Sequence, residues 1–253
     1  MPLTVHQFPV LDDNYAFLVR DEASGKTACI DTPDAKAILA ELSKLGWSLD
    51  LILNTHWHPD HAGGNAEIQA ATGAVSVGPA EVGRLVAVDR VITGGERVEL
   101  GETVFDVIEA GGHTLGHIAY YDRADAIAFV GDTLFALGCG RLFEGTAQQM
   151  WTSLQRLAAL PDDTRVYCAH EYTASNARFA LSVDDDPALA ARARAIFAAR
   201  ERGEPTVPTS IGLEKATNPF LRAPLLAERV GAAGRPAAEA FGAVRAAKDS
   251  FKG

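Results

Sequence analysis

The chain has 253 residues, of which 47% are hydrophobic and 22% charged, and its formal net charge is −10. These fractions are ordinary for a globular protein, and the chain is long enough to bury a sizeable core. The negative net charge argues against a nucleic-acid backbone as the main partner.

The cysteine content and the apolar patterning bear on the compartment. Cys29, Cys139 and Cys168 are widely spaced and form no C-x-x-C pair, which predicts a reducing compartment and no disulfide framework. The chain opens with no basic segment followed by an apolar one, and no apolar run approaches a membrane span. We therefore expect a cytoplasmic protein with no membrane partner, and a monomer is the default oligomeric state.

Predicted strands outnumber helices in the first two thirds of the chain. In chain order, the predicted strands are 3–10, 15–20, 27–31, 49–54, 74–77, hairpins within 91–110, 119–121, 126–130 and 165–168, and the predicted helices are 34–45, 63–72 and 147–160. After Glu171 the sequence becomes rich in alanine, arginine and leucine and predicts almost continuous helix, broken near 203–205 and at Pro208. We therefore predict a core domain over residues 1–173 and a small helical domain over residues 174–253.

The densest cluster of metal-ligand residue types lies in Thr55–Asn65, with the sequence THWHPDHAGGN. The apolar stretch before it predicts a buried strand, so the cluster lies where a strand ends and the chain turns. His56 and His58 are two residues apart, and in extended backbone their side chains project to the same side. Imidazoles at this spacing suit a divalent cation such as zinc, and Asp60 and His61 can reach a second one. A metal-free polar turn is the alternative, but so many unliganded imidazoles would be costly to bury.

Further residues of ligand type follow predicted apolar strands, at the strand ends where layered α/β folds gather their sites. They are His113, Asp132 and His170. His117 lies four residues after His113, and position alone does not distinguish which of the two is the ligand. His6 lies in the first predicted strand without a companion and is expected to be an ordinary strand histidine.

Motifs in chain order resemble those of the metallo-β-lactamase superfamily: HWHPDH at 56–61, GHTLGH at 112–117, GDTLF at 131–135 and AHEYT at 169–173. More narrowly, the chain resembles the glyoxalase II family, the hydroxyacylglutathione hydrolases, at GCGR 138–141, FEGT 143–146, NPFLR 218–222 and RAAKD 245–249. The resemblance runs in order through nearly the whole chain and includes the helical tail.

The resemblance implies a fold and a set of site residues. The fold would be α+β, a four-layer αββα sandwich with a small C-terminal all-helical domain. Two divalent metal ions are implied, zinc first, with iron or manganese compatible. One ion would be held by His56, His58 and His113, and the second by Asp60, His61 and His170, with Asp132 bridging both. By the same resemblance His117 is not a ligand, and glutathione recognition falls on Arg141, Phe143, Tyr172, Arg245 and Lys248. Arg141 stands where lysine is common, and Phe143 stands where tyrosine is common.

The implied activity is a metal-dependent thioester hydrolase. It would convert S-(2-hydroxyacyl)glutathione, such as S-D-lactoylglutathione, to a 2-hydroxy acid, D-lactate, and glutathione, in methylglyoxal detoxification. Asp60 and Asp132 are the predicted catalytic residues, because two cations bridged by a carboxylate can hold a bridging hydroxide for attack on the acyl carbonyl. No Ser/His/Asp set suggests a covalent intermediate. Cys139 and Cys168 are expected to be small buried residues. Asp31 is either an acceptor for a ligand histidine or a plain strand-end carboxylate.

The substrate itself is expected to be held by its charges. Glutathione carries two carboxylates, and Arg245 and Lys248, three residues apart on a predicted helix, lie on one face. A solvated helix face is the alternative for this pair, and the RAAKD motif favours binding.

Three other functions are compatible with parts of the sequence. A mononuclear-iron persulfide dioxygenase on the same fold would need His56, His58, His113 and Asp132 but not the second ligand set. A nuclease would need a phosphate-binding surface that the net charge does not suggest. A zinc-stabilised binding module would need only one ion with four protein ligands, often cysteines, and no open coordination position. The hydrolase uses the whole ligand set and is the preferred interpretation.

Overall fold

The computed structural model describes residues 2–253 and divides into two compact units. One unit comprises the chain up to Glu109 together with Gly116–Gly131, and the other comprises Ala110–Leu115 and Asp132–Gly253.

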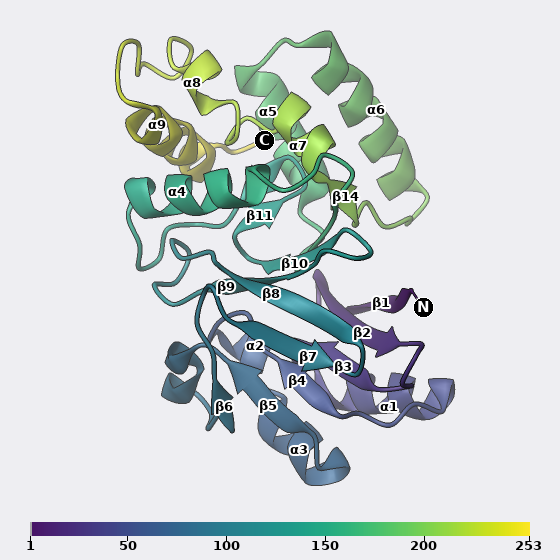
Figure 1. The fold of residues 1–253 in the computed structure, drawn as a ribbon. Coiled ribbons are helices and arrows are strands. Elements are labelled where there is room, and N and C mark those ends of the chain that lie inside the picture. The colour runs from purple at the N-terminus through teal and green to yellow at the C-terminus, as the bar shows by residue number, and fades with distance from the viewer. Residues whose placement is uncertain (1) are drawn as a thin grey trace. The chain divides into compact units, whose positions relative to one another are not determined.

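The first unit contains two sheets (Figure 1). In the first sheet the strands follow chain order, antiparallel from β1 to β3 and parallel from β3 to β6. These strands are β1 (Leu3–Val10), β2 (Asn14–Asp21), β3 (Thr27–Ile30), β4 (Leu51–Leu53), β5 (Val75–Gly78) and β6 (Arg90–Val91). The second sheet holds the antiparallel meander β7 (Arg97–Leu100), β8 (Thr103–Glu109), β9 (Ile118–Asp122) and β10 (Ile127–Gly131).

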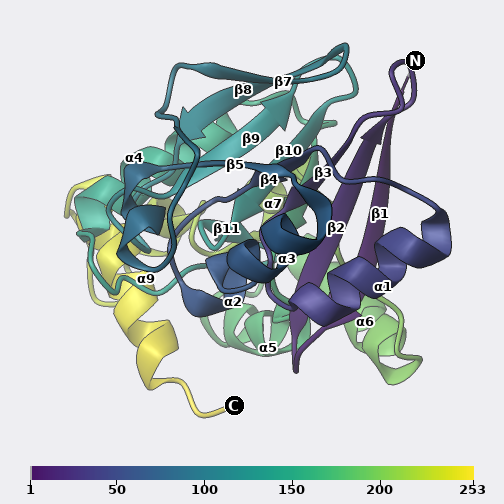
Figure 2. The ribbon, with the colours of Figure 1, turned by 90° about the horizontal axis from the view of Figure 1, so that it is seen from below.

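Strand β2 shows how the first sheet is buried on both faces. Successive side chains of a strand point to opposite faces. Ala16 and Leu18, two residues apart, lie on the same face of β2. They pack in a cluster with Ile38 and Leu42 of α1 (Ala35–Leu45) and Ile68 of α3 (Asn65–Thr72). Figure 2 shows α1 and α3 side by side against this sheet. The alternate residue Phe17 instead meets Phe129 of the second sheet, with ring centroids 5.7 Å apart. The apolar residues of β2 therefore pack on both faces of the sheet, one covered by helices and the other by the second sheet.

Helix α1 begins and ends where its capping residues predict. The Asp34 side chain accepts a hydrogen bond from the amide of Ala37, which satisfies a donor that the first turn leaves over. At the other end Gly46 adopts the left-handed conformation with φ 67°, and its amide closes the last turn. The predicted span 34–45 is thus confirmed.

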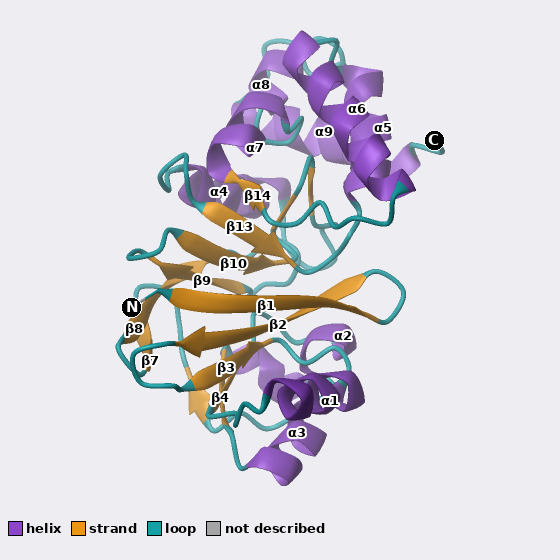
Figure 3. Ribbon diagram, turned by 90° about the vertical axis from the view of Figure 1, so that its right-hand side faces the viewer, coloured by secondary structure: helices purple, strands orange, loops and turns teal. Residues whose placement is uncertain are grey.

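The second unit is mostly helical, as the purple elements of Figure 3 show. Its helices are α4 (Ala147–Ala158), α5 (Thr173–Val183), α6 (Pro187–Glu201), α7 (Ile211–Thr217), α8 (Ala223–Leu226) and α9 (Ala237–Ser250). Its strands are the hairpin β11 (Leu134–Phe135) and β12 (Gly138–Cys139), and the pair β13 (Arg165–Cys168) and β14 (Thr209–Ser210). The rings of Phe179, Phe220 and Phe241 contact one another in sequence and link α5 to α9.

Two local features differ from the predictions. The short helix α2 (Pro59–Ala62) occupies a stretch predicted to be a turn, because Pro59 stands at its first position, where a missing amide costs nothing. Strand β14 interrupts the predicted helical domain, because Thr209 and Ser210 pair with β13. No helix within residues 2–253 is long and apolar enough to cross a membrane.

Candidate metal centre

The predicted ligand cluster lies in the first unit, directly after β4. His56 is fully buried, and its Nε2 lies 3.1 Å from Nδ1 of His58. The imidazole of His61, which belongs to α2, lies with its centroid 4.0 Å from that of His56. Asp60 precedes it, with a carboxylate oxygen 3.6 Å from Nε2 of His61. The motif therefore gathers three imidazoles and a carboxylate at one strand end, as predicted.

Asp31 follows β3, and its carboxylate contacts both Thr55 and His61 of this cluster. Its carboxylate lies 2.8 Å from Nδ1 of His61 and accepts hydrogen bonds from the amide of Thr55 at 2.7 Å and from the Thr55 hydroxyl at 2.8 Å. An Nδ1–H bonded to a carboxylate directs the Nε2 lone pair of that imidazole outward, as ligand histidines require. Asp31 has a φ of 57°, a left-handed conformation that places this carboxylate. The structure thus favours the acceptor interpretation of Asp31.

The carbonyl of His61 is anchored by three donors. The amide and hydroxyl of Thr32 and the Nδ2 of Asn54 all lie within hydrogen-bond reach of this oxygen, at 2.7, 3.3 and 3.1 Å. Asn54 and Asn65 also exchange amide hydrogen bonds, at 2.6 and 3.1 Å. Because all these groups are buried and paired, the backbone that carries His61 is rigidly placed.

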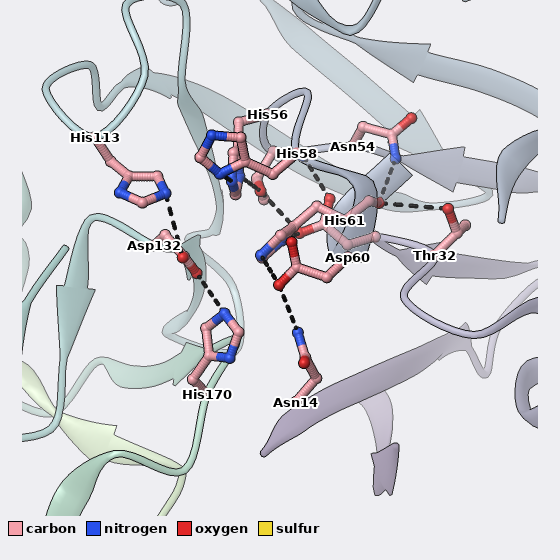
Figure 4. Close-up of polar contacts among 12 residues, drawn as sticks. Asn14, Thr32, Asn54, His56, His58, Asp60, His61, His113, Asp132 and His170 are labelled. Atoms are coloured by element: carbon pink, nitrogen blue, oxygen red, sulfur yellow. Dashed lines mark hydrogen bonds and ion pairs between the residues drawn. The ribbon is translucent and has the colours of Figure 1, made fainter. Parts of the chain in front are cut away.

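Asn14 is a site residue that sequence reasoning missed. It is buried at the start of β2, and its Nδ2 donates to Oδ2 of Asp60 at 3.1 Å (Figure 4). In the sequence, Asn14 follows two aspartates and predicts only a turn. Its partner Asp60 lies 46 positions later in the chain, and no local pattern contains that contact.

In the second unit, Asp132 lies between two imidazoles. Its Oδ2 lies 3.4 Å from Nε2 of His113, and its Oδ1 lies 3.3 Å from Nε2 of His170 (Figure 4). All three side chains are buried, and Asp132 and His170 follow β10 and β13 as predicted. A carboxylate that directs each oxygen to a different imidazole has the geometry that a bridging ligand needs.

The two histidines of the GHTLGH motif have different surroundings. His113 has its Nδ1 2.9 Å from the carbonyl oxygen of Arg141, which leaves Nε2 on the side of Asp132. His117 belongs to the first unit and stacks on His56, with centroids 4.6 Å apart and an interplanar angle of 21°. His117 thus packs against the imidazole of His56, a candidate ligand. His6 lies in β1 as predicted, and its Nε2 is 3.0 Å from Glu41.

The donor set fits divalent metal ions. In the first unit, Nε2 of His56 lies 3.1 Å from Nδ1 of His58, and a carboxylate oxygen of Asp60 lies 3.6 Å from Nε2 of His61. The second unit adds an aspartate flanked by two imidazoles. Imidazole and carboxylate donors of this kind suit zinc, iron and manganese.

A cavity of about 470 Å³ lies within the second unit, beside His113 and Asp132. It is lined by all five residues predicted to bind glutathione: Arg141, Phe143, Tyr172, Arg245 and Lys248. Phe143 is 62% exposed, and its ring contacts the imidazole of His113 with centroids 5.2 Å apart. The cavity therefore joins two candidate ligand residues, His113 and Asp132, to a set of cationic and aromatic side chains.

The cations of the cavity differ in accessibility. Arg245 is only 5% exposed and donates from Nη1 to the carbonyl of Cys139 at 2.9 Å and from Nη2 to Asp249 at 2.8 Å. Lys248 is partly buried, and its Nζ lies 3.1 Å from the hydroxyl of Ser175. Burial, with the nearby arginines, lowers the pKa of Lys248 to about 8. Arg141 is exposed.

Cys139 and Cys168 are buried, as predicted, and Cys29 is buried as well. None of the three forms a disulfide. Burial raises the pKa of the Cys139 thiol to about 11 and that of Cys168 to about 12, so neither is a thiolate at neutral pH.

Comparison with known proteins identifies the family. Residues 12–170 match the model of the metallo-beta-lactamase superfamily, and residues 171–251 match the model described as hydroxyacylglutathione hydrolase C-terminus. A hydroxyacylglutathione hydrolase of Erythrobacter litoralis is 55% identical over 98% of this chain and 100% of its own length. The structure of ETHE1 from Myxococcus xanthus matches with a TM-score of 0.66 at 26% identity, over 96% of this chain and 97% of that one. TTHA1623, solved in a di-iron-bound form, matches with a TM-score of 0.63 at 27% identity, over 86% of this chain and 100% of that one.

These matches, with the two sheets and the helical C-terminal segment, confirm the predicted α+β metallo-β-lactamase fold. The chain belongs to the hydroxyacylglutathione hydrolase family of the metallo-β-lactamase superfamily.

Proposed function

We propose that this enzyme hydrolyses S-(2-hydroxyacyl)glutathione, with S-D-lactoylglutathione as the representative substrate, to a 2-hydroxy acid and glutathione. Family membership at 55% identity over nearly the full chain supports this activity. The observation that carries the proposal is the cavity beside His113 and Asp132, because it combines metal-ligand residues with cations suited to a peptide carrying carboxylates.

The proposed centre holds two divalent ions. One ion is assigned to His56, His58 and His113, and the other to Asp60, His61 and His170, with Asp132 shared. The two differently directed oxygens of Asp132 support the shared role. The di-iron-bound form of TTHA1623, at 27% identity, supports the number of ions. We propose zinc as the resident ion, with iron and manganese suited to the same donors.

The chain's own residues orient this chemistry. When bound, such ions lower the pKa of a shared water and polarise the acyl carbonyl. Asp31 and the carbonyl of Arg141 direct the Nε2 atoms of His61 and His113 outward. The leaving group is a thiolate, which needs no proton from a dedicated acid. Asp60 and Asp132 are therefore the proposed catalytic carboxylates, and no cysteine takes part.

Recognition of the glutathione part is assigned to the helical tail and the loop before α4. Residues 174–253 contain twelve lysines and arginines against nine aspartates and glutamates, a net charge of +3 in a chain of −10. We propose that Arg141, Arg245 and Lys248 bind the peptide carboxylates and that Phe143 and Tyr172 contact the peptide backbone. On this basis residues 1–173 form the catalytic domain and residues 174–253 the glutathione-binding domain, a division that the family boundary at 170–171 supports. We further propose a cytoplasmic monomer.

The test is steady-state hydrolysis of S-D-lactoylglutathione, followed by the loss of thioester absorbance, with the metal content of the same protein measured in parallel. Rapid turnover with about two ions per chain is expected, because the proposed ligands form two sets. Asp132→Ala should abolish turnover and lower the metal content, whereas Asp163→Ala, at an exposed position, should change neither. Absence of thioester hydrolysis with two ions bound would refute the substrate assignment, and oxygen uptake with glutathione persulfide would point to the dioxygenase instead.

A further inference from the structure

Glu214 of α7 is a fully buried carboxylate whose two oxygens face different parts of the second unit. Its Oε1 accepts hydrogen bonds from the hydroxyl of Thr209 at 2.5 Å and from Nη2 of Arg192. Its Oε2 accepts from the amide of Leu137 at 2.9 Å and from Nδ2 of Asn218 at 2.9 Å. Oε1 of Glu214 thus binds groups of β14 and α6, whereas Oε2 binds the hairpin formed by β11 and β12 through the amide of Leu137.

The turn of this hairpin is held almost entirely by side chains from helices. Asn218 directs its Nδ2 to the carbonyl of Phe135 at 3.1 Å and to that of Gly138 at 2.9 Å. Nδ2 of Asn176 donates to the carbonyl of Ala136 at 3.1 Å. Leu137 has a φ of 56°, a conformation that a side chain disfavours, so the turn depends on such contacts to keep its shape.

The same hairpin reaches the metal-ligand residues. Phe135 presents its ring to the imidazole of His170, with centroids 5.9 Å apart and an angle of 84°. Two residues after Gly138, the backbone at Gly140 lies so close to Asp132 that a Cβ there would be 2.0 Å from the Asp132 carbonyl oxygen. The next carbonyl, that of Arg141, is the partner of His113 Nδ1. A displacement of the hairpin therefore changes the surroundings of both histidines that flank Asp132.

We propose that Glu214 is a positioning residue for the hydrolytic site: by holding the amide of Leu137 it fixes the hairpin, and the hairpin fixes the orientation of His113. The helical tail then has a second role besides substrate recognition, since it sets the geometry of ligand residues that lie before it in the chain. The inference rests on the proposed function only where turnover is measured.

A purely structural role is the competing interpretation, because Glu214 also neutralises Arg192. The two oxygens allow the roles to be separated. Glu214→Gln keeps the shape but removes the charge that strengthens the bond to Leu137. Thr209→Val is the matched control, since it removes a donor to Oε1 and leaves the hairpin side intact. Asn218→Ala is the second hairpin-side variant, for use if Glu214→Gln does not fold.

The experiment compares these variants by hydrogen–deuterium exchange of residues 134–141 in the metal-free protein and by the visible spectrum of the cobalt-substituted protein. In Glu214→Gln, exchange at the Leu137 amide should accelerate about tenfold, because the charged acceptor of its hydrogen bond is replaced by a weaker, neutral one. The cobalt spectrum should shift, and kcat should fall more than KM rises. Thr209→Val should lower Tm without these changes.

The proposal is overturned if Thr209→Val, at an equal loss of Tm, gives the same hairpin exchange and the same spectrum as Glu214→Gln. It is also overturned if the hairpin-side variants leave exchange and spectrum at wild-type values. Failure of the wild-type protein to hydrolyse the thioester would remove the proposed function alone, since exchange and spectrum still decide the role of Glu214.

Discussion

The imidazole of His170 lies parallel to the phenol ring of Tyr172, with centroids 4.7 Å apart and 2° between the ring planes. Phe135 meets both rings edge-on, with centroids 5.9 and 5.5 Å away. The stacked ring of Tyr172 and the edge-on ring of Phe135 thus limit the rotation of the His170 imidazole, which flanks Asp132. A residue assigned to the substrate on the basis of family resemblance therefore also packs against a proposed metal ligand.

Tyr172 is expected to affect metal binding through this stack. Tyr172→Phe keeps the ring and should leave the metal content unchanged, so that any change in KM reports the hydroxyl. Tyr172→Ala removes a contact worth about 0.5–1.5 kcal/mol and should weaken metal binding by up to about tenfold. Competition with a chelator of known affinity measures this difference. Equal metal affinity in both variants would contradict a supporting role for the ring.

Asn14→Ala should weaken metal retention by about 10- to 100-fold, the usual effect of removing a hydrogen bond to a metal ligand. The cause is the lost bond to Asp60, whose partly exposed carboxylate then lacks one of the donors that fix its orientation. The measurement is ions per chain after dialysis against graded chelator. Asp12→Ala, at an exposed position in the same turn, is the control and should retain wild-type metal content.

The affinity for the peptide should depend on pH through Lys248. Because its pKa is lowered to about 8, the ammonium is charged below that pH and loses its proton above it. KM for the thioester should therefore rise as the pH passes about 8, while it stays level below. Lys248→Arg keeps the charge at alkaline pH and should flatten this rise. A rise of equal size in the arginine variant would assign the titration to another group.

Phe143→Tyr should lower KM about threefold to tenfold by adding a hydroxyl to the cavity lining, a gain typical of one hydrogen bond. Phe143 is largely exposed, so Tm should not change. Steady-state kinetics on the same substrate gives the answer. An unchanged KM would show that the hydroxyl finds no partner in the complex.

Local sequence patterns were enough to predict most elements and the strand-end positions of the candidate ligand residues. Strands 3–10 and 165–168 have the predicted bounds, and His113, Asp132 and His170 all follow strands as expected. Such features depend on short-range rules: alternation, capping residues and the ends of apolar runs. The motif at 56–61 is equally local, since three histidines and an aspartate within six positions are typical of a metal site.

The supporting contacts required long-range information. Asn14 and Asp60 are 46 positions apart, and Glu214 and Leu137 are 77 apart. Nothing in the local sequence around Asn14 or Glu214 distinguishes them from a turn residue and a helix-surface carboxylate. The contact of Arg245 Nη1 with the carbonyl of Cys139, 106 positions earlier in the chain, illustrates the same limit.

The burial of the three thiols has a consequence for an enzyme whose proposed product is itself a thiol. Thiol–disulfide exchange proceeds through a thiolate that can be reached by its partner, and Cys139 and Cys168 are neither ionised at neutral pH nor exposed. Glutathione and its disulfide therefore find no accessible thiol among residues 2–253 with which to form a mixed disulfide. The activity is expected to stay constant while the redox state of the surrounding glutathione pool varies.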